Sequence, residues 1–475
     1  MTNTKAMSPV IVEAKYSKTG VDRYNGNPLI EALPAPPQCR AEFDSFVEHT
    51  PPKPDDTARQ KSEVVRLMEA MTMKDLVYSF PEYSKACLAM ATLMRESYVS
   101  RNPLNATDVQ RRHALATRSS DGVLFPDDWK SSADGYFIIA ITGMGKTTLM
   151  ESFLVRHPQL IKHTSYQGKP VPCRYQIVYL YLRIPHNGTL TALCLQFFRK
   201  VDGLLGTNYT RQAKGVRSIA PMVELMNQVA SAVSLSFIVV DELQNLRSAR
   251  GENPDIALNY LSEIIEGLGI SVICISTPGV HSVLQTKVRS IRKLSSAGSM
   301  VIQPMKKGDA QWKTFCELCW DYTYVKNKPR LDEATMNVWH DISAGNTAFA
   351  ALVFLLTQQN EIGGREVVDM DALKRTASTD MAFLQPAIAA LRSGKSERLR
   401  DFDDLIYGEK YRDLQRLLGV ENGSDDVPDA EVEELEEIEQ AVKNSVKSRQ
   451  RRKKLQQQPE QGWSEDIAIR DPLEP

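Results

Sequence analysis

The segment from Ala140 to Thr147, AITGMGKT, constrains the fold of this chain more than any other stretch. It fits the phosphate-binding pattern G-x-x-x-x-G-K-[ST], except that alanine stands at the position of the first glycine. Alanine costs little there if the backbone φ is negative. The apolar runs YFIIA before the loop and LMESFLV after it predict a strand and a helix on its two sides. The segment therefore predicts a nucleotide-binding loop, and the alternative is a purely structural strand, turn and helix.

The loop also predicts which groups would contact ATP. Such a cradle works because backbone N–H groups and a helix N-terminus converge on an anion. Gly143 and Gly145 lie where the chain must approach the phosphates closely, and Lys146 brings a positive charge to the outer phosphates. The Thr147 hydroxyl can ligate Mg²⁺. The full set of predicted ATP-binding residues in this loop is Thr142, Gly143, Met144, Gly145, Lys146, Thr147 and Thr148.

A second motif follows about 90 residues later, where the apolar run LSFIVVD ends in Asp241 and is followed by Glu242. A carboxylate at the end of a buried strand is costly unless it has a task. We expect Asp241 to bind the nucleotide and to hold Mg²⁺ through water, and Glu242 to polarise the attacking water. An Asp-Glu turn at the surface is the alternative. Since a phosphotransferring kinase needs no water activator, Glu242 favours an ATPase.

Three further features bear on catalysis. The run VICIST is expected as a strand between the two motif strands, and Thr277 or Ser276 at its end would orient the lytic water. Arg289 and Arg292 lie at helical spacing in KVRSIRKL, where an arginine commonly reaches the γ-phosphate of a neighbouring subunit; a solvated basic face is equally compatible. The segment SAGNTAFAAL carries small residues where a sensor-two arginine would stand, which predicts slow or conditional hydrolysis.

Composition sets wider limits. The 475 residues are 42% hydrophobic and 25% charged, which is typical of a soluble globular protein. The chain shows no apolar run of about 18 residues and no signal peptide, so we expect neither a membrane span nor secretion. Seven scattered cysteines fit a cytoplasmic location better than a disulfide framework. The C-x-x-C of Cys316 and Cys319 has no second pair to complete a zinc site.

The order of apolar segments predicts the domain organisation. Between residues 136 and 304, continuous apolar strands alternate with helices, which predicts an α/β fold with a five-stranded parallel sheet flanked by helices. We expect an N-terminal extension over residues 1–105, irregular and Pro-rich to about residue 50 and then helical. The α/β core would cover residues 106–305, a helical region 306–400, and a charged flexible tail 401–475.

With these motifs in place, the chain resembles the AAA+ P-loop ATPases that regulate transposition, of the TnsC/TniB/MuB type, and TnsC most closely. The resemblance covers roughly residues 12–405. It rests on the stretches YSKTGVDRYNGNPLIEALP, SYVSRNP, HNGTLTALCLQFFRKVDGLLGTNY, VVDELQNL and ALRSGKSERLRDFDDL, which match in order and spacing. It implies an AAA+ core with a helical lid and an N-terminal helical extension. It also implies ATP-dependent assembly as a ring or helical filament on duplex DNA, a signal from a target-selector protein, and recruitment of the transposase, with hydrolysis controlling the assembly.

Two charged segments would serve these partners. Arg199, Lys200, Arg211, Lys214 and Arg217 stand against a single acid, Asp202, and predict phosphate contacts to duplex DNA without sequence readout. A solvated basic helix is the alternative. The tail has an acidic block at residues 421–440, a basic block at 443–454 and an apolar cluster around Trp463. We expect it to recruit transposase subunits, with a merely solubilising tail as the alternative.

Two other functions stay open from the sequence. One is a nucleotide switch or adaptor that does not hydrolyse ATP. The other is a helicase-loader or initiator ATPase of related fold, although the chain shows no convincing winged-helix segment after residue 395.

Overall fold

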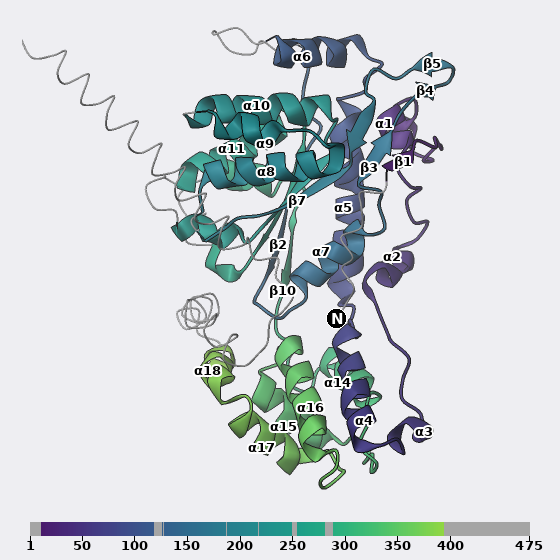
Figure 1. Ribbon diagram of the computed structural model, residues 1–475, viewed down its shortest axis with the longest axis vertical. Coiled ribbons are helices and arrows are strands. Elements are labelled where there is room, and N and C mark those ends of the chain that lie inside the picture. The colour runs from purple at the N-terminus through teal and green to yellow at the C-terminus, as the bar shows by residue number, and fades with distance from the viewer. Residues whose placement is uncertain are drawn as a thin grey trace, which may run out of the picture.

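The computed structural model describes residues 11–117, 126, 128–186, 188–216, 218–248, 254–280 and 288–393. Its centre is a five-stranded sheet in which every neighbouring pair of strands is parallel (Figure 1). The strand order is β10-β2-β9-β8-β7, so β9 lies between the two motif strands β2 and β8 as the sequence predicted. The strands are β2 (Gly135–Ala140), β7 (Tyr179–Arg183), β8 (Phe237–Asp241), β9 (Ser271–Ser276) and β10 (Ser299–Ile302). The predicted fold class, a five-stranded parallel sheet flanked by helices, is confirmed.

Helices cover both faces of this sheet (Figure 1). Side chains alternate along a strand, so Ile138 and Phe137 of β2 belong to different hydrophobic clusters on opposite faces. Both residues are buried, and all residues of β8 and β9 are buried as well, which explains why their sequences are continuously apolar. One face carries α5 (Pro81–Val99) and α7 (Lys146–Leu154). The other carries α8 (Leu190–Leu205), α10 (Ile219–Ala232), α11 (Pro254–Glu266) and α13 (Val288–Leu294).

Helix α5 lies directly on the sheet, in contact with β2, β8, β9 and β10. Pro81 stands at the start of the helix, where its missing N–H is harmless. The buried side of α5 repeats at helical spacing with Tyr83, Cys87, Met90, Met94 and Tyr98. A helix from the expected N-terminal extension is thus part of the layer that covers the α/β core. The division of the chain at residue 105 stays a prediction.

The first 50 residues hold more regular structure than their proline content indicates. Strand β1 (Ile11–Glu13) pairs in parallel with β3 (Leu160–Lys162), which pairs antiparallel with β6 (Tyr175–Ile177). Helix α2 (Arg40–Val47) packs on α5 and α7. Pro28 is the first residue of a short helix, where its missing N–H is harmless, and Pro34, Pro36 and Pro37 lie before α2 outside any strand or helix. The other short elements of the upper part are α1 (Pro28–Glu31), α6 (Ala106–Ala116), α9 (Tyr209–Lys214) and the hairpin β4 (Ser165–Tyr166) and β5 (Lys169–Pro170).

A layer of helices follows β10 and forms the lower part of Figure 1. It consists of α14 (Ala310–Trp320), α15 (Glu333–Ser343), α16 (Thr347–Glu361), α17 (Met370–Thr379) and α18 (Gln385–Ser393). We call it the helical layer. Its core includes the rings of Trp312, Trp320, Trp339 and Phe354, which contact one another. No helix in the described part of the chain is long and apolar enough to cross a membrane.

Residues 51–75 run along the helical layer before the chain enters α5, and we call this segment the strap. It contains α3 (Asp56–Arg59), α4 (Glu63–Glu69) and the 3-10 helix η2 (Ala70–Asp75). The buried Arg66 of the strap donates two hydrogen bonds of 2.7 Å to the carboxylate of Glu366. Arg59 Nε donates to the Thr323 carbonyl at 3.1 Å. The strap therefore holds the helical layer from outside, by contacts between residues far apart in the sequence.

Candidate nucleotide-binding site

The predicted phosphate loop lies between β2 and α7. Ala140 is the last residue of β2 and has extended backbone, so alanine fits at the position of the missing glycine. Gly143 and Gly145 have φ of 85° and 78°, in the left-handed region that side chains disfavour. Helix α7 begins at Lys146, immediately after Gly145. The loop thus has the strand, the left-handed turns and the helix N-terminus that its sequence predicts.

Both glycines are also required by close neighbours outside the loop. A Cβ atom at Gly143 would lie 2.7 Å from Asn346 Oδ1 and 2.9 Å from the Cβ of Ala348. A Cβ atom at Gly145 would lie 2.5 Å from the Tyr83 hydroxyl. A side chain at either position would push the loop away from α16 or from α5. The glycines therefore permit a contact between protein segments, in addition to the approach of a phosphate.

Three consecutive carbonyls of the loop accept hydrogen bonds from these neighbours. Asn346 Nδ2 donates to Thr142 O at 2.8 Å, Thr347 Oγ1 to Gly143 O at 2.9 Å, and Tyr83 Oη to Met144 O at 3.1 Å. In a planar trans peptide the C=O and the following N–H point in opposite directions. Because these carbonyls point outward, the N–H groups that follow them point to the other side of the loop. That is the orientation a phosphate cradle needs.

The side chain of Lys146, the first residue of α7, turns back onto the start of the loop. It is 8% exposed, and its Nζ donates to the carbonyls of Ala140 at 2.6 Å and Ile141 at 3.2 Å. Thr147 and Thr148 follow in the first turn of α7 and are half-buried. The ammonium group is thus held by the carbonyls at the end of β2, and it can exchange these carbonyl partners for phosphate oxygens.

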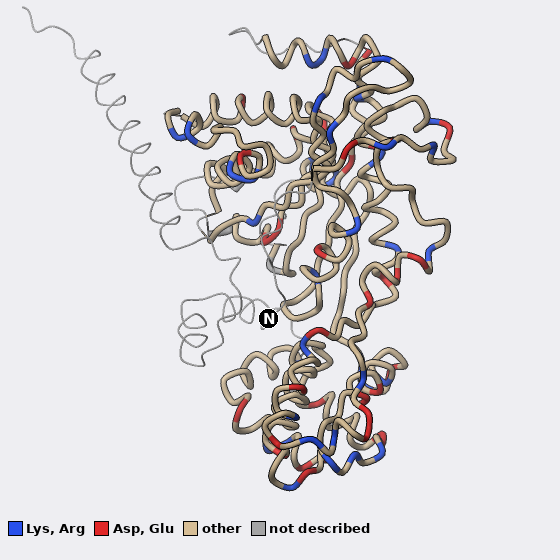
Figure 2. Tube along the Cα trace, turned by 45° about the vertical axis from the view of Figure 1, so that its right-hand side comes forward, with Lys and Arg blue, Asp and Glu red and all other residues tan. Residues whose placement is uncertain are grey.

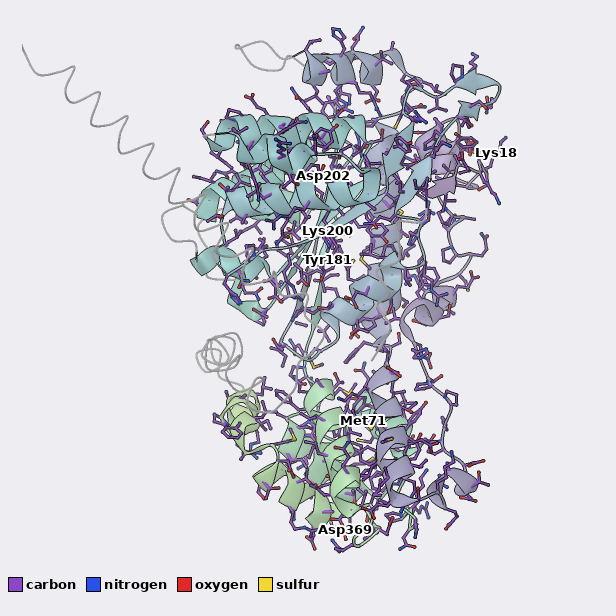
Figure 3. All side chains as sticks on the ribbon, in the orientation of Figure 1. Lys18, Met71, Tyr181, Lys200, Asp202 and Asp369 are labelled. Atoms are coloured by element: carbon purple, nitrogen blue, oxygen red, sulfur yellow. The ribbon has the colours of Figure 1, made fainter. Side chains whose placement is uncertain are left out.

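Asp241, the last residue of β8, is 1% exposed, and both its carboxylate oxygens have partners. Oδ1 accepts from the Glu242 backbone N–H at 2.8 Å, and Oδ2 accepts from the hydroxyl of Tyr181 on β7, labelled in Figure 3. Burial and the charge of Asp241 raise the pKa of Tyr181, so this hydroxyl keeps its proton and donates it. Tyr181 sets the orientation of the predicted Mg²⁺-binding carboxylate, and the sequence motifs did not point to it.

Glu242 lies just beyond the strand and has a φ of 57°, a left-handed conformation that is strained for a residue with a side chain. Burial and the neighbouring charge of Asp241 raise the pKa of the Glu242 carboxyl, while Arg183 and Lys146 lower it. Because β2 and β8 are parallel and only β9 lies between them, the loop after β2 and this carboxylate lie at the same edge of the sheet. The structure therefore brings the two predicted motifs together.

Gln244 connects Glu242 to the end of β9. Its Nε2 donates to Glu242 Oε2, and its Oε1 accepts from Ser276 Oγ at 2.8 Å and from the Thr277 backbone N–H at 3.2 Å. Since the Ser276 hydroxyl is engaged, Thr277 is the better candidate for orienting a water molecule. Its Oγ1 is buried and has no hydrogen-bond partner within the described residues. The role predicted for Thr277 stays a prediction, and Gln244 is a second residue to which the sequence motifs did not point.

The predicted arginines lie apart from these contacts, on α13. The Arg289 side chain is 85% exposed and its Nη2 lies 3.7 Å from Glu266 Oε2 of α11; Arg292 is exposed as well. Lys293 makes the shorter ion pair with Glu266, at 2.7 Å. Exposure is compatible with reaching a neighbouring subunit, and the catalytic role of both arginines stays a prediction.

Four of the five basic residues predicted to contact DNA lie on two helices that contact each other. Arg199 and Lys200 belong to α8, and Arg211 and Lys214 to α9; Figure 3 labels Lys200 and Asp202. Lys200, Arg211 and Lys214 are exposed. By contrast, Lys and Arg lie beside Asp and Glu over much of the helical layer, at the bottom of Figure 2. Arg217 lies outside the described residues, as does the tail at 401–475 that was predicted to recruit transposase.

Asp202, the one acid of this segment, has a structural role. Its carboxylate accepts from the Thr207 hydroxyl at 2.6 Å and from the backbone N–H groups of Tyr209 and Thr210, both at 2.8 Å. It thereby closes the turn between α8 and α9. These hydrogen bonds lower the pKa of Asp202 against the effect of burial. Asp202 fixes the geometry of the basic surface while cancelling part of its charge.

One protein-family model agrees with this core. The AAA domain family matches residues 130–284, which include the phosphate loop, both carboxylates and the end of β9. No curated protein sequence matches the chain. Similar solved structures include the ORC1 protein of Aeropyrum pernix in complex with DNA, with 15% identity, a TM-score of 0.36, and coverage of 72% of this chain and 87% of that one.

Two further structures are similar at the same level. A Walker-type ATPase of Pyrococcus abyssi has 14% identity and a TM-score of 0.36, covering 65% of this chain and 84% of that one. The ORC2 protein of Aeropyrum pernix, solved as ADPNP–ADP complexes, has 14% identity and a TM-score of 0.33, covering 71% and 93%. The sheet order, the phosphate loop and the matched family together identify the α/β core as an AAA+ P-loop fold.

Proposed function

We propose that this protein binds ATP with Mg²⁺ at the loop between β2 and α7 and hydrolyses it. The observation that carries the proposal is that the phosphate loop follows β2 and Asp241 ends β8, two parallel strands of one sheet with only β9 between them. The carboxyl ends of these parallel strands lie at the same edge of the sheet, and burial raises the pKa of the half-buried Glu242 there. Perturbed carboxylates of this kind, next to a phosphate cradle, are typical of catalytic sites.

Each residue has a defined role in this reaction. Loop N–H groups and Lys146 would hold the β- and γ-phosphates, and Thr147 together with Asp241 would hold Mg²⁺, directly or through water. Glu242 would accept a proton from the attacking water, which its raised pKa favours. Thr277 would orient that water. Arg289 or Arg292 would complete the site of a neighbouring subunit, so that hydrolysis depends on assembly.

The biological role we propose is regulation of DNA transposition. The support is the sequence resemblance to the TnsC-type regulators, which extends well beyond the ATPase motifs. The exposed basic residues of α8 and α9 support contact with duplex DNA phosphates without sequence readout. The protein would assemble as a homo-oligomer on target DNA, couple a target-selector protein to the transposase, and use hydrolysis to control the lifetime of the assembly.

The test is ATP turnover with and without duplex DNA, combined with imaging of the assemblies. We expect turnover to rise with DNA and filaments or rings to form with ATP. Glu242→Gln keeps a carbonyl acceptor but cannot take up a proton, so it should bind ATP, stop hydrolysing it and form longer-lived assemblies. Arg289→Ala and Arg292→Ala should separate the candidate fingers, since only the true finger loses DNA-stimulated turnover. Wild-type turnover that survives in Glu242→Gln would contradict the assignment.

A nucleotide switch that does not hydrolyse ATP is the second candidate, and one contact favours it. Gln244 holds the Glu242 carboxylate to the end of β9, so the proton acceptor is engaged within the chain. Small residues also stand where a sensor-two arginine would reach the nucleotide. Tight ATP binding with no turnover, with or without DNA, would favour the switch over the ATPase.

A further inference from the structure

The three loop carbonyls held from outside join the phosphate loop to two remote parts of the chain. Tyr83 reaches the loop from α5, and Asn346 and Thr347 reach it from the start of α16 in the helical layer. A fourth contact, from the Ala348 backbone N–H to Gly143 O at 3.2 Å, strengthens the link to α16. Tyr83 and Asn346 are 1% and 0% exposed, whereas Thr347 and the Thr142 and Gly143 acceptors are half-buried.

Both polar atoms of the Asn346 side-chain amide form hydrogen bonds, one to α16 and one to the phosphate loop. Its Oδ1 caps α16 by accepting from the N–H groups of Ala348 at 3.1 Å and Phe349 at 3.2 Å. Its Nδ2 is then directed away from the helix and donates to Thr142 O. One planar side chain therefore fixes the end of the helix relative to the loop, and a shift of the loop carbonyl must either break this bond or move the helix.

The turn that precedes α16 is held by close contacts and hydrogen bonds to Met305. Ala344 and Gly345 both have positive φ, 54° and 69°, and a Cβ atom at Gly345 would lie 2.0 Å from the Met305 carbonyl. The Met305 N–H donates to Gly345 O at 3.0 Å, and His340 Nε2 lies 2.9 Å from Met305 O. Met305 belongs to the link between β10 and α14. The helical layer thus contacts the core at two places, at Met305 and at the phosphate loop. The turn at Ala344 and Gly345 connects these two contacts.

We propose that Asn346 and Thr347 are positioning residues that couple nucleotide occupancy of the phosphate loop to the placement of the helical layer. This inference rests on the proposed binding of ATP to the loop. The residues act through backbone carbonyls of the loop, and in this chain they stand where a sensor-two arginine would contact the nucleotide itself. They preorient the loop N–H groups for phosphate, and by reciprocity ATP holds α16 against the loop.

The variants that test this keep the helix cap. Asn346→Ser retains an oxygen acceptor suited to an N-cap but is too short to donate to Thr142 O. Thr347→Val removes only the hydroxyl and keeps the shape of the side chain. Asp332→Ser is the matched control, because Asp332 caps α15 in the same layer by accepting from Thr335 N at 2.7 Å, and its carboxylate takes part in no bond to the loop. Tyr83→Phe removes the hydrogen bond from α5 to the Met144 carbonyl, and so tests the contact that the loop makes with α5.

Two measurements follow. ATP affinity should fall about tenfold in the Asn346→Ser/Thr347→Val double variant, as expected for losing two part-buried hydrogen bonds that preorganise the site, and should stay within about twofold in Asp332→Ser. Amide exchange over residues 343–352 should slow when ATP is added to the wild-type protein and to Asp332→Ser. In the double variant this response to ATP should disappear, even where binding is saturated.

Each outcome decides a separate point. A double variant that binds ATP as tightly as the wild-type protein, or that retains the full exchange response at saturation, overturns the coupling while leaving the proposed ATP site intact. If the wild-type protein does not bind ATP at all, the proposed function fails and the coupling fails with it. Loss of the response in Asp332→Ser would attribute the effect to helix capping in general, and would also overturn the assignment to Asn346 and Thr347.

Discussion

The ion pair between Arg66 and Glu366 should carry much of the attachment between the strap and the helical layer. Side-chain exposure is only 2% for Arg66 and 13% for Glu366, and the two hydrogen bonds between them are both 2.7 Å long. The N–H groups of Gly363 and Lys326 also donate to the carboxylate, at 2.8 and 3.1 Å. Replacing Glu366 with glutamine removes the charge and leaves the Arg66 guanidinium buried without its counterion.

The magnitude follows from the titration of the carboxyl. The hydrogen bonds from Arg66, followed by the backbone donors, lower the pKa of Glu366 from 4.5 to about 2. At about 1.4 kcal/mol for each pH unit, this corresponds to about 3 kcal/mol of stabilisation at neutral pH. That value agrees with the roughly 3–5 kcal/mol measured when one partner of a buried pair is removed.

The pH dependence has a defined sign. A carboxyl whose pKa is lowered by folding contributes its stability above its ordinary pKa of 4.5, and this contribution is lost as the pH falls towards about 2. Urea unfolding should therefore show Glu366→Gln less stable than the wild-type protein by about 3 kcal/mol at pH 7. The gap should fall to about half of this value or less at pH 3, because most of the contribution is lost between pH 4 and about 2.

A surface pair between the same two segments supplies the control. Lys53 of the strap and Asp321 of the helical layer are 2.8 Å apart, but their side chains are 52% and 44% exposed. Asp321→Asn should change stability by less than about 1 kcal/mol. If Glu366→Gln has an equally small effect at pH 7, or if its effect is the same at pH 3, then the reasoning from burial and charge is refuted.

Three other perturbations test the site and the proposed DNA surface. Because burial raises the pKa of Glu242, its ionised form destabilises the native state once the pH exceeds the ordinary 4.5; Glu242→Gln should therefore melt higher than the wild-type protein at pH 8 and equally at pH 4. Equal melting temperatures at pH 8 would contradict this. Tyr181→Phe removes the hydroxyl that orients the neighbouring carboxylate, and should lower Mg²⁺-dependent turnover about tenfold or more with ATP affinity changed less than about threefold; unchanged turnover would show that the carboxylate is held without it. Replacing Lys200, Arg211 and Lys214 with alanine should weaken duplex binding at every sequence and flatten the slope of log affinity against log salt by roughly one for each phosphate that the variant no longer binds. An unchanged slope would place the DNA on another surface.

Local patterns in the sequence were sufficient for the central sheet and the loop. Continuous apolar strands predict a parallel sheet that is buried on both faces, even before the covering helices are known. The loop residues from Thr142 to Thr148 are adjacent in the chain, so one short motif identifies them. The apolar run YQIVYLYLRI is typical of one continuous strand, but it divides at Val178 into β6 and β7. The two halves join different sheets, because β6 pairs antiparallel with β3 while β7 pairs in parallel with β8. Periodicity is the same in both halves and therefore could not show the change.

The groups that orient the site could not be predicted in the same way. Tyr83 lies 61 residues before Met144, whose carbonyl it contacts, and Tyr181 lies 60 residues before Asp241. Neither tyrosine belongs to a motif, and their contacts exist only once the sheet has formed. Asn346 carried a partial signal, since an asparagine before the apolar run TAFAAL predicts a helix N-cap. That pattern fixes the start of the helix but not the second partner of the amide.

The most direct test of the central claim is equilibrium binding of Mg²⁺–ATP to the wild-type protein and to Lys146→Ala. Lys162→Ala is the matched control, because Lys162 pairs with Glu13 at 2.6 Å on the surface, away from the loop. We expect tight binding by the wild-type protein and by Lys162→Ala, and no measurable binding by a folded Lys146→Ala protein. ATP affinity of Lys146→Ala within about threefold of the wild-type value would contradict the assignment of this loop as the nucleotide site.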